Sequence, residues 1–279
     1  MKILKDKRII SSLCCPHCKA QMLVREEGSG VIACMGKKTH CFDISAIGHS
    51  NFSRPSQSGG GDSAPAVKAR SAFLSKGFYS PIADAIAGLV TKYADGSGVV
   101  VDAGCGEGYY SMRIASEGYS VFGIDISKPA VEAASKRAKR DGCDNAFFGV
   151  ASVFEMPVMD RSASVITNIF APCVEEEYAR ALKKDGVLIV AYAGEDHLMG
   201  LKRMIYDNAY LNEVNRADLP KNMKEIERVR VRAEVLCPDN DTVMELFSMT
   251  PYYWRTSKED SDKLLGHKER ADTLYSQPK

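Results

Sequence analysis

Short apolar runs separated by amphipathic segments fill the central part of this chain. Five runs rich in β-branched and aromatic residues predict buried strands: Val99–Asp102, the GYSVFGID segment that ends at Asp125, Phe147–Val150, Val165–Phe170 and Val187–Tyr192. Because helical segments separate these strands, we expect a parallel, doubly wound α/β sheet. In such a sheet, ligands bind at the carboxyl ends of the strands.

Helical patterns surround the first strands of the predicted sheet. Asp62 or Ser63 is placed to cap a helix that the segment GFYSP then breaks. A second helix runs from about Pro81 to Tyr93 and leads into the sheet. The segment KPAVEAASKRAKRDG predicts a further helix, which Gly142 ends. Residues 200–235 indicate either a helical insertion or a pair of strands.

A glycine-rich turn follows the first strand. Three glycines stand at alternate positions after Asp102: Gly104, Gly106 and Gly108. Such a turn has no room for a Cβ atom, and it lets the backbone approach a ligand at the start of the next helix. The dinucleotide fingerprint requires glycine at 109, where this chain has Tyr109. Asp125 follows about twenty residues after Gly104, where an acid accepts hydrogen bonds from ribose hydroxyls.

These two motifs resemble motifs I and II of the class I S-adenosylmethionine-dependent methyltransferases. The alternatives are an NAD enzyme or a Rossmann-like turn that holds no ligand. The resemblance implies that Asp102, the three glycines and Asp125 bind the cofactor. Ala151 and Ser152 follow the third strand, where many relatives carry an acid near the adenine. Here that contact would rest on backbone groups or on the Ser152 hydroxyl.

The N-terminal part of the chain has the cysteine spacing of a metal site. Cys15 and Cys18 form a C-x-x-C pair, and fifteen residues separate this pair from Cys34. The segment between them, QMLVREEGSGVIAC, predicts two short strands joined by a Glu-Gly-Ser-Gly turn, which is typical of a zinc ribbon. The fourth ligand is His40 or Cys41, and Cys14 and His17 are further candidates.

Structural zinc is the interpretation that these cysteines favour. A redox C-x-x-C normally opens a helix after a strand, which this segment does not predict. A catalytic zinc would need an open position, whereas four candidate protein ligands close the site. A segment this small could hardly fold without metal, since its core is too thin to offset chain entropy.

Composition divides the chain into parts. The segment 48–65 is rich in Gly, Ser and Pro, which predicts a linker. We therefore expect a zinc-binding domain over 1–48, a linker and connecting helix over 49–80, and a Rossmann-like domain over 81–279. Residues 1–97 hold 13 Lys and Arg against 7 Asp and Glu, although the net charge of the chain is only +1. The positive potential of the N-terminal part would attract an anionic partner.

Bulk properties are those of a globular cytoplasmic protein. The chain has 279 residues, of which 45% are hydrophobic and 26% are charged. No apolar run is as long as a membrane span, and the N-terminus MKILKDKRII has no apolar signal-peptide region. We therefore expect no membrane association, and we expect the nine cysteines to be free or metal-bound.

The ordered set of motifs resembles the 23S ribosomal RNA (guanine-N1)-methyltransferase family. These motifs are the zinc ribbon with H-x-F-D, then GDSA, ARSAFL-x-x-G-x-Y, DAGCGEG, NIFAPC, GEDHLMGLKRMIY and MTPYYWR. The resemblance implies a zinc domain that recognises RNA, a class I domain that holds S-adenosylmethionine, and a homodimer. It places structural Zn²⁺ on Cys15, Cys18, Cys34 and His40. Five residues separate Cys34 from His40, where three are usual, so Cys41 remains an alternative ligand.

Methylation of guanine N1 requires an extruded base and a path for the N1 proton. No general base is identified. Asn168, at the end of the fourth strand, is a candidate to hydrogen-bond the guanine edge. His197, in the GEDHLM segment, is a candidate for proton removal or for a cofactor contact. The aromatic candidates to hold the base are Phe170, Tyr252, Tyr253 and Trp254.

A set of basic residues in the N-terminal part would neutralise RNA phosphates. They are Lys2, Lys5, Lys7, Arg8, Lys37, Lys38, Arg54, Lys68 and Arg70. The first alternative function is a methyltransferase that acts on a small molecule or a protein and carries an accessory zinc ribbon. The second is an RNA-binding factor whose cofactor pocket is a relic, against which the intact glycine motif and Asp125 argue.

Overall fold

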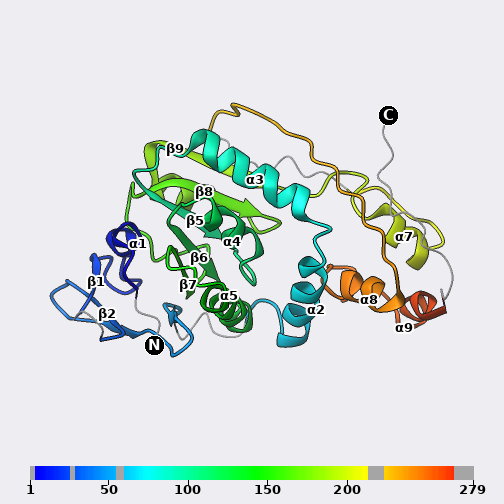
Figure 1. Ribbon diagram of the computed structural model, residues 1–279, viewed down its shortest axis with the longest axis horizontal. Coiled ribbons are helices and arrows are strands. Elements are labelled where there is room, and N and C mark those ends of the chain that lie inside the picture. The colour runs from blue at the N-terminus through cyan, green and yellow to red at the C-terminus, as the bar shows by residue number, and fades with distance from the viewer. Residues whose placement is uncertain (1–3, 26–28, 55–59, 213–222, 267–279) are drawn as a thin grey trace. The chain divides into compact units, whose positions relative to one another are not determined.

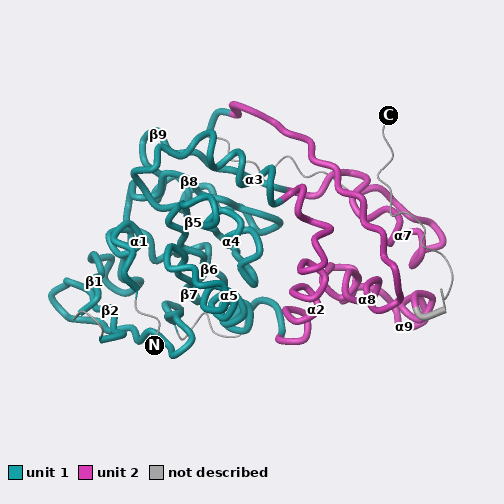
Figure 2. Tube along the Cα trace, in the orientation of Figure 1, with its two compact units in different colours: residues 1–63, 83–191, 219–224 teal, residues 64–82, 192–218, 225–279 magenta. Residues whose placement is uncertain are grey.

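The computed structural model describes residues 4–25, 29–54, 60–212 and 223–266. The chain forms two compact units, shown in different colours in Figure 2. The first unit comprises residues 1–63, 83–191 and 219–224, and the second comprises residues 64–82, 192–218 and 225–279. Each unit has its own arrangement of elements and is treated separately below.

A six-stranded sheet is the centre of the first unit (Figure 1). In spatial order its strands are β4 (His49–Asn51), β7 (Ala146–Val150), β6 (Val121–Asp125), β5 (Val99–Ala103), β8 (Ala163–Ile169) and β9 (Leu182–Ala191). All neighbouring strands pair in parallel. Strands β5, β7 and β8 are buried over their full lengths, as is usual for parallel strands that are covered on both faces. The predicted doubly wound α/β class is confirmed.

Strand β4 lies inside the segment that was expected to be a linker. It pairs with β7 and forms one edge of the sheet, so the boundary predicted between 48 and 49 falls at the start of a strand. Further along the same segment, the Ser127 hydroxyl donates to the Asp62 carbonyl oxygen at 2.7 Å. Gly, Ser and Pro contribute little side-chain burial, but backbone pairing does not depend on side-chain composition. Composition alone therefore missed this strand.

Two strand boundaries also differ from the prediction. Strand β8 ends at Ile169, because Phe170 adopts a left-handed backbone conformation with φ of +53°. Strand β9 begins at Leu182 rather than Val187, since Leu182 already pairs with Ala163 of β8. After the buried Leu182, the extra residues of β9 are Lys183, Lys184, Asp185 and Gly186, which are partly or fully exposed and so are missed by a search for apolar runs.

Helices flank the sheet of the first unit. They are α3 (Ser80–Tyr93), whose residues from 83 onward belong to this unit, α4 (Tyr109–Ser116), α5 (Lys128–Arg140) and α6 (Glu175–Ala181). Helices α4 and α5 both contact β6 and β7. The hydroxyl of Ser127 accepts from the Ala130 amide and caps α5. Helices α3 and α5 agree with the predicted segments to within about two residues.

The N-terminal segment forms a small three-stranded antiparallel sheet. It consists of β1 (Met22–Val24), β2 (Val31–Cys34) and β3 (Cys41–Asp43), preceded by helix α1 (Lys7–Ser12). The predicted pair of strands corresponds to β1 and β2. The predicted Glu-Gly-Ser-Gly turn between them begins outside the described residues.

This ribbon packs on the large sheet rather than standing apart from it. The Cys14 amide donates to the Pro157 carbonyl at 3.0 Å, and the Met159 amide donates to the Ser12 carbonyl at 2.7 Å. Phe52 is 1% exposed, and its ring centroid lies 5.2 Å from that of Phe42 in β3 and 6.2 Å from that of Phe122 in β6. The ribbon and the sheet therefore share one hydrophobic core.

The second unit is helical. Its elements are α2 (Ala64–Ser75), α7 (Met199–Ile205), α8 (Asn240–Ser248), α9 (Lys258–Asp262) and the short helix η3 (Lys263–Gly266). Helices α2 and α8 pack together. Beyond the end of α2, the Lys76 ammonium donates to the Thr242 hydroxyl at 2.7 Å and lies 2.6 Å from a Glu245 oxygen. Of the segment 200–235, α7 is helical, residues 223–234 form neither helix nor strand, and 213–222 lie outside the described residues.

In the part of the chain that the structure describes, no helix has both the length and the apolar character needed to cross a bilayer.

The packing of Phe52 yields a stability prediction. Phe52→Ala should lower the free energy of unfolding by about 4 kcal/mol, because it opens a cavity between the ribbon and the sheet. Phe154→Ala, at a side chain that is 68% exposed, should cost less than about 0.5 kcal/mol. Denaturant unfolding measures both values. A cost for Phe52→Ala that matches the control would contradict the shared core.

Candidate functional site

The glycine turn follows β5 and lies at the carboxyl ends of the strands, which we call the open edge of the sheet. Gly104, Gly106 and Gly108 have φ values of +83°, +54° and +78°, a region that side chains disfavour. A Cβ atom on Gly104 would lie 2.6 Å from the Cβ of Ala171, and one on Gly108 would lie 2.9 Å from that of Ala134. Neighbouring chain therefore excludes side chains here, and α4 begins directly afterwards at Tyr109. Backbone amides at such a helix start favour a ligand with acceptor groups.

Asp125 closes this turn from the end of β6. One carboxylate oxygen accepts from the Gly106 amide at 2.9 Å, and the other accepts from the Ser127 amide at 2.8 Å. The residue is only partly buried. A carboxylate has about four acceptor positions and can accept several hydrogen bonds at once.

Asp102 lies beneath the turn rather than at its surface. It is 1% exposed and accepts hydrogen bonds from the hydroxyls of Ser111 in α4 and Thr167 in β8. Burial raises the pKa of its carboxyl to about 6, although both hydroxyls oppose this rise. The carboxylate thus joins β5 to the helix after the turn and to the adjacent strand. The motif predicts a role for Asp102 in cofactor binding, and the two hydrogen bonds show that its carboxyl also holds the turn.

Ser152 lies in the loop that follows β7, at the same edge of the sheet. It is 7% exposed, and its hydroxyl accepts from the Phe154 amide at 3.2 Å. The segment that contains Gly61 also reaches this edge. A Cβ atom on Gly61 would lie 2.8 Å from the Cβ of Ser127, two residues beyond Asp125. Gly61 is the first residue of the GDSA motif. The motif by itself does not predict that this segment packs against Ser127.

Asn168 has its side chain directed into the protein. It is 1% exposed, and its amide nitrogen donates to the Pro172 carbonyl at 2.9 Å and to the Tyr178 hydroxyl at 2.8 Å. The amide that was a candidate to bind the guanine edge is therefore engaged within the turn after β8. Tyr178, in α6, was not identified from the sequence, because no motif links it to this turn.

His197 belongs to the second unit. Its Nε2 atom lies 3.1 Å from the Tyr79 hydroxyl, and burial lowers the pKa of the imidazole to about 4. The ring is therefore neutral at pH 7 and a weak proton acceptor. The Asn212 side chain donates to the His197 carbonyl at 3.0 Å and fixes this loop.

The aromatic candidates at 252–254 also lie in the second unit. Tyr253 and Trp254 are 42% and 68% exposed, with ring centroids 5.0 Å apart. The Tyr252 hydroxyl instead donates to the Asn212 side chain at 2.9 Å.

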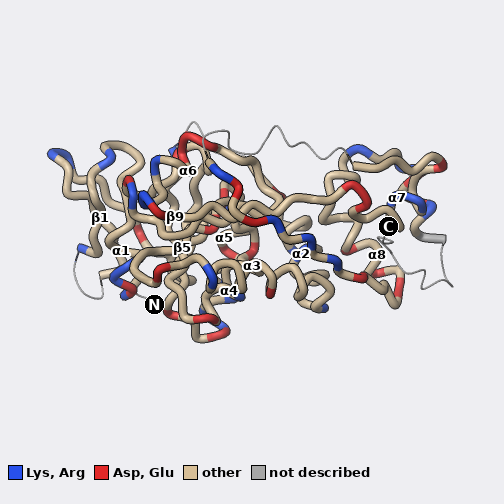
Figure 3. Tube along the Cα trace, turned by 90° about the horizontal axis from the view of Figure 1, so that it is seen from above, with Lys and Arg blue, Asp and Glu red and all other residues tan. Residues whose placement is uncertain are grey.

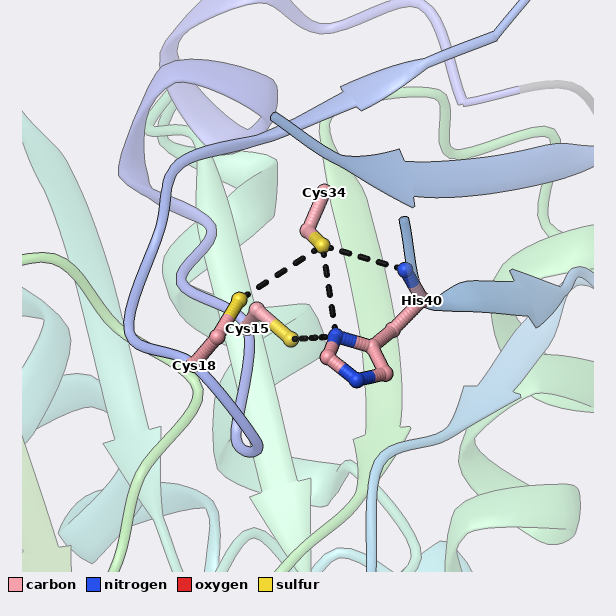
Figure 4. Close-up of side chains that lie close together, drawn as sticks. All are labelled: Cys15, Cys18, Cys34 and His40. Carbon is pink, nitrogen blue, oxygen red and sulfur yellow. Dashed lines mark hydrogen bonds between the residues drawn. The ribbon is translucent and has the colours of Figure 1, made fainter. Parts of the chain in front are cut away.

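Four predicted metal ligands come together in the ribbon (Figure 4). The ligand atoms of Cys15, Cys18, Cys34 and His40 all lie within 4.8 Å of one another. The Cys34 sulfur is 3.6 Å from that of Cys18 and 3.4 Å from His40 Nδ1, which is 3.6 Å from the Cys15 sulfur. Tetrahedral zinc with bonds of about 2.0–2.3 Å places its ligand atoms about 3.4–3.8 Å apart, so these spacings fit the ion.

The longer spacing before His40 is accommodated by a glycine. A Cβ atom on Gly36 would lie 2.8 Å from the Cys18 sulfur, so the inserted residues turn tightly beside the cluster. The His40 amide donates to the Cys34 sulfur at 3.1 Å. Burial would raise the pKa of the Cys34 thiol, but hydrogen bonds from His40 and Gly36 outweigh it and lower that pKa to about 6. Cys41 is exposed and stands outside the four-residue group.

The two remaining ligand candidates also stand outside this group. The thiol of Cys14 contacts the Lys19 carbonyl oxygen at 3.5 Å, and the His17 ring stacks on Phe42 with centroids 5.9 Å apart.

The predicted RNA-binding residues fall into different settings. Lys5, Lys7, Arg8, Lys37 and Lys38 are exposed on the N-terminal segment, and Figure 3 shows basic positions along α1 and the ribbon. Arg54 instead donates to the Pro16 carbonyl and to Glu155, at 2.8 Å for the latter, and so ties the cysteine pair to the loop after β7. Lys68 and Arg70 lie in α2 of the second unit, and Lys2 lies outside the described residues.

Comparison with known proteins identifies the family of the chain. Residues 94–259 match the family model described as a methyltransferase domain. The chain is 30% identical over 271 residues to the 23S rRNA (guanine(748)-N(1))-methyltransferase of Streptomyces fradiae, covering 92% of this chain and 90% of that one. It is 31% identical to the Bacillus subtilis protein YxjB, provisionally named as a 23S rRNA (guanine-N(1)-)-methyltransferase, with 92% of both chains covered.

Among solved structures, the YcgJ protein of Bacillus subtilis is 25% identical over 45% of this chain and 60% of that one, with a TM-score of 0.36. The alignments to the two rRNA methyltransferase sequences each cover 92% of this chain. The chain therefore belongs to the 23S rRNA (guanine-N1)-methyltransferase family.

Proposed function

We propose that this protein transfers a methyl group from S-adenosylmethionine to N1 of a guanine in a domain II hairpin of 23S rRNA. The observation that carries the proposal is the alignment to the Streptomyces fradiae enzyme over 92% of this chain. An enzyme for small molecules would share only the cofactor half. The glycine turn and Asp125 supply the features that the cofactor requires.

The cofactor fits the open edge of the sheet between β6 and β8. Backbone groups of Gly104, Gly106 and Gly108 would face its amino-acid part, and Asp125 would accept from its ribose hydroxyls. Ser152 and its loop would lie toward the adenine. Asp102 would contribute indirectly, because it holds the turn through Ser111 and Thr167.

The bound cofactor would supply a sulfonium methyl group that a nitrogen can attack. In this step the N1–C bond forms with the N1 electron pair, the C–S bond breaks, and S-adenosylhomocysteine leaves with the electrons of that bond. The N1 proton passes to water or to a group of the protein. His197 is the titratable candidate, and its neutral state at pH 7 permits the role while its low pKa limits it. The Asn168 amide does not titrate.

The ribbon would bind structural Zn²⁺ through Cys15, Cys18, Cys34 and His40 and would present basic residues to RNA. Lys5, Lys7, Arg8, Lys37 and Lys38 are exposed there and would neutralise phosphates. We also propose that the protein acts as a homodimer in the cytoplasm, where its rRNA substrate is found.

Methyl transfer to rRNA tests the proposal directly. Protein supplied with labelled S-adenosylmethionine should methylate 23S rRNA and cause a primer-extension stop in the domain II hairpin, because N1-methylguanine cannot pair. Asp125→Ala should reduce transfer by about tenfold or more, since each lost hydrogen bond to the cofactor weakens binding. Asp144→Ala, at an exposed position, is the control. Label in small molecules or proteins but not in rRNA would favour the alternative methyltransferase.

A measurement of zinc content decides whether His40 or Cys41 is the fourth ligand. Elemental analysis should find about one zinc per chain in the wild type and in Cys41→Ser, but less in His40→Ala, because three ligands hold the ion more weakly than four. Chelation should also lower the unfolding temperature of the wild type. Zinc loss in Cys41→Ser with retention in His40→Ala would reverse the assignment.

The buried Asp102 predicts a defined pH dependence of stability. Its folded pKa of about 6 exceeds the unfolded value of about 3.9, so the folded protein keeps this proton longer than the unfolded chain as pH rises. The stabilisation of the folded state by the proton on Asp102 is fully present below pH 4 and is lost as the pH passes 6. In Asp102→Asn this loss is absent, so the variant should gain up to about 3 kcal/mol relative to the wild type between pH 4 and pH 7.

Denaturant unfolding at several pH values measures this gain. Asp144→Asn, an exposed carboxylate with the same change in charge, is the control. A constant difference between Asp102→Asn and the wild type over this pH range would contradict the raised pKa.

A further inference from the structure

The turn after β8 holds an aromatic residue in an unfavourable backbone conformation. Phe170 has a φ of +53°, and among the described residues only Lys19, Arg161 and Leu198 share a positive φ without being glycine. A bulky residue in the left-handed region is a steric outlier, and Gly, Asn or Asp is the usual choice there. The Phe170 side chain is also 45% exposed. Backbone strain of this kind is concentrated at functional sites, which makes the exposed ring a candidate for a ligand contact.

A buried hydrogen-bond triad spans the turn that contains Phe170. The Asn168 amide nitrogen donates to both the Pro172 carbonyl and the Tyr178 hydroxyl, and that hydroxyl donates to the same carbonyl at 3.1 Å. Asn168 and Tyr178 are 1% and 0% exposed. The bonds therefore span the turn, from the last residues of β8 to the residue two beyond Phe170. Water cannot compete for these groups, so the turn is held in one shape.

The turn lies beside the glycine turn, on the side away from Asp125. In the sheet, β5 stands between β6 and β8, so the acid at the end of β6 and Phe170 after β8 flank the glycines from opposite sides. The close approach of Ala171 to Gly104 shows that the two turns touch. If the ribose is on the β6 side, the β8 side is left for the methyl acceptor.

We propose that Asn168 and Tyr178 are positioning residues that hold the Phe170 ring where it stacks on the acceptor guanine. This inference rests on the proposed function, because it assumes a planar base as acceptor. An extruded purine offers a flat π face, and stacking on an aromatic side chain is a common way to hold one. The fixed turn holds the ring in its stacking position before the base binds. Binding therefore restricts the motion of the base but not that of the ring.

Steady-state kinetics with rRNA and a direct measurement of S-adenosylmethionine affinity test this role. Tyr178→Phe removes only the hydroxyl and should lower kcat/KM for rRNA by about tenfold, with cofactor affinity unchanged within about twofold. Phe170→Gly should lower kcat/KM further while folding as the wild type does, because glycine tolerates the left-handed conformation. Tyr119→Phe is the matched control, because Tyr119 lies just before β6, at the amino ends of the strands. This variant should leave kcat/KM for rRNA and the cofactor affinity unchanged.

The double variant separates positioning from a general structural effect. If Tyr178 acts through Phe170, adding Tyr178→Phe to Phe170→Gly should cause no further loss. An equal tenfold loss in both backgrounds would overturn the positioning role, and a Phe170→Gly variant with wild-type kinetics would overturn the stacking role. Absence of transfer by the wild type would instead refute the proposed function.

Discussion

The close approach of backbone segments at the glycine turn is the constraint on which the site depends. At Gly104 and Gly108 there is no space for a side chain, and both residues adopt a left-handed conformation. Asp125 closes the turn from outside through the Gly106 amide, and Asp102 anchors it from below. The order of strands then places Asp125 on one side of the turn and Phe170 on the other.

The ribbon extends this constraint to the N-terminus. Phe52 joins its core to that of the sheet, while Arg54 links the carbonyl of Pro16, within the cysteine pair, to Glu155 in the loop after β7. Lys19 pairs with the same glutamate at 3.0 Å. The Cys/His cluster and the residues around the glycine turn thus belong to one packed unit, so a disturbance of the ribbon would reach the loop that carries Ser152.

Motifs of short range predicted those parts of the site whose chemistry is local. The spacing of Cys15, Cys18, Cys34 and His40 brought four ligands together, since a C-x-x-C pair and a hairpin determine most of that geometry. Alternating glycines located the turn. Asn168 was placed at the correct strand end, but its side chain points into the protein, because a partner ten residues later in the sequence, Tyr178, binds it.

Sequence by itself determined the α/β class, the glycine turn, the ribbon and the family, because apolar periodicity, glycine positions and cysteine spacing are properties of neighbouring residues. Only the tertiary structure decided that β4 completes the sheet, that Asp102 is buried under the turn, and that Phe170 is held in a strained conformation. Each of these depends on contacts between segments distant in the chain. Such contacts leave no periodic signal, since either partner alone is compatible with many environments.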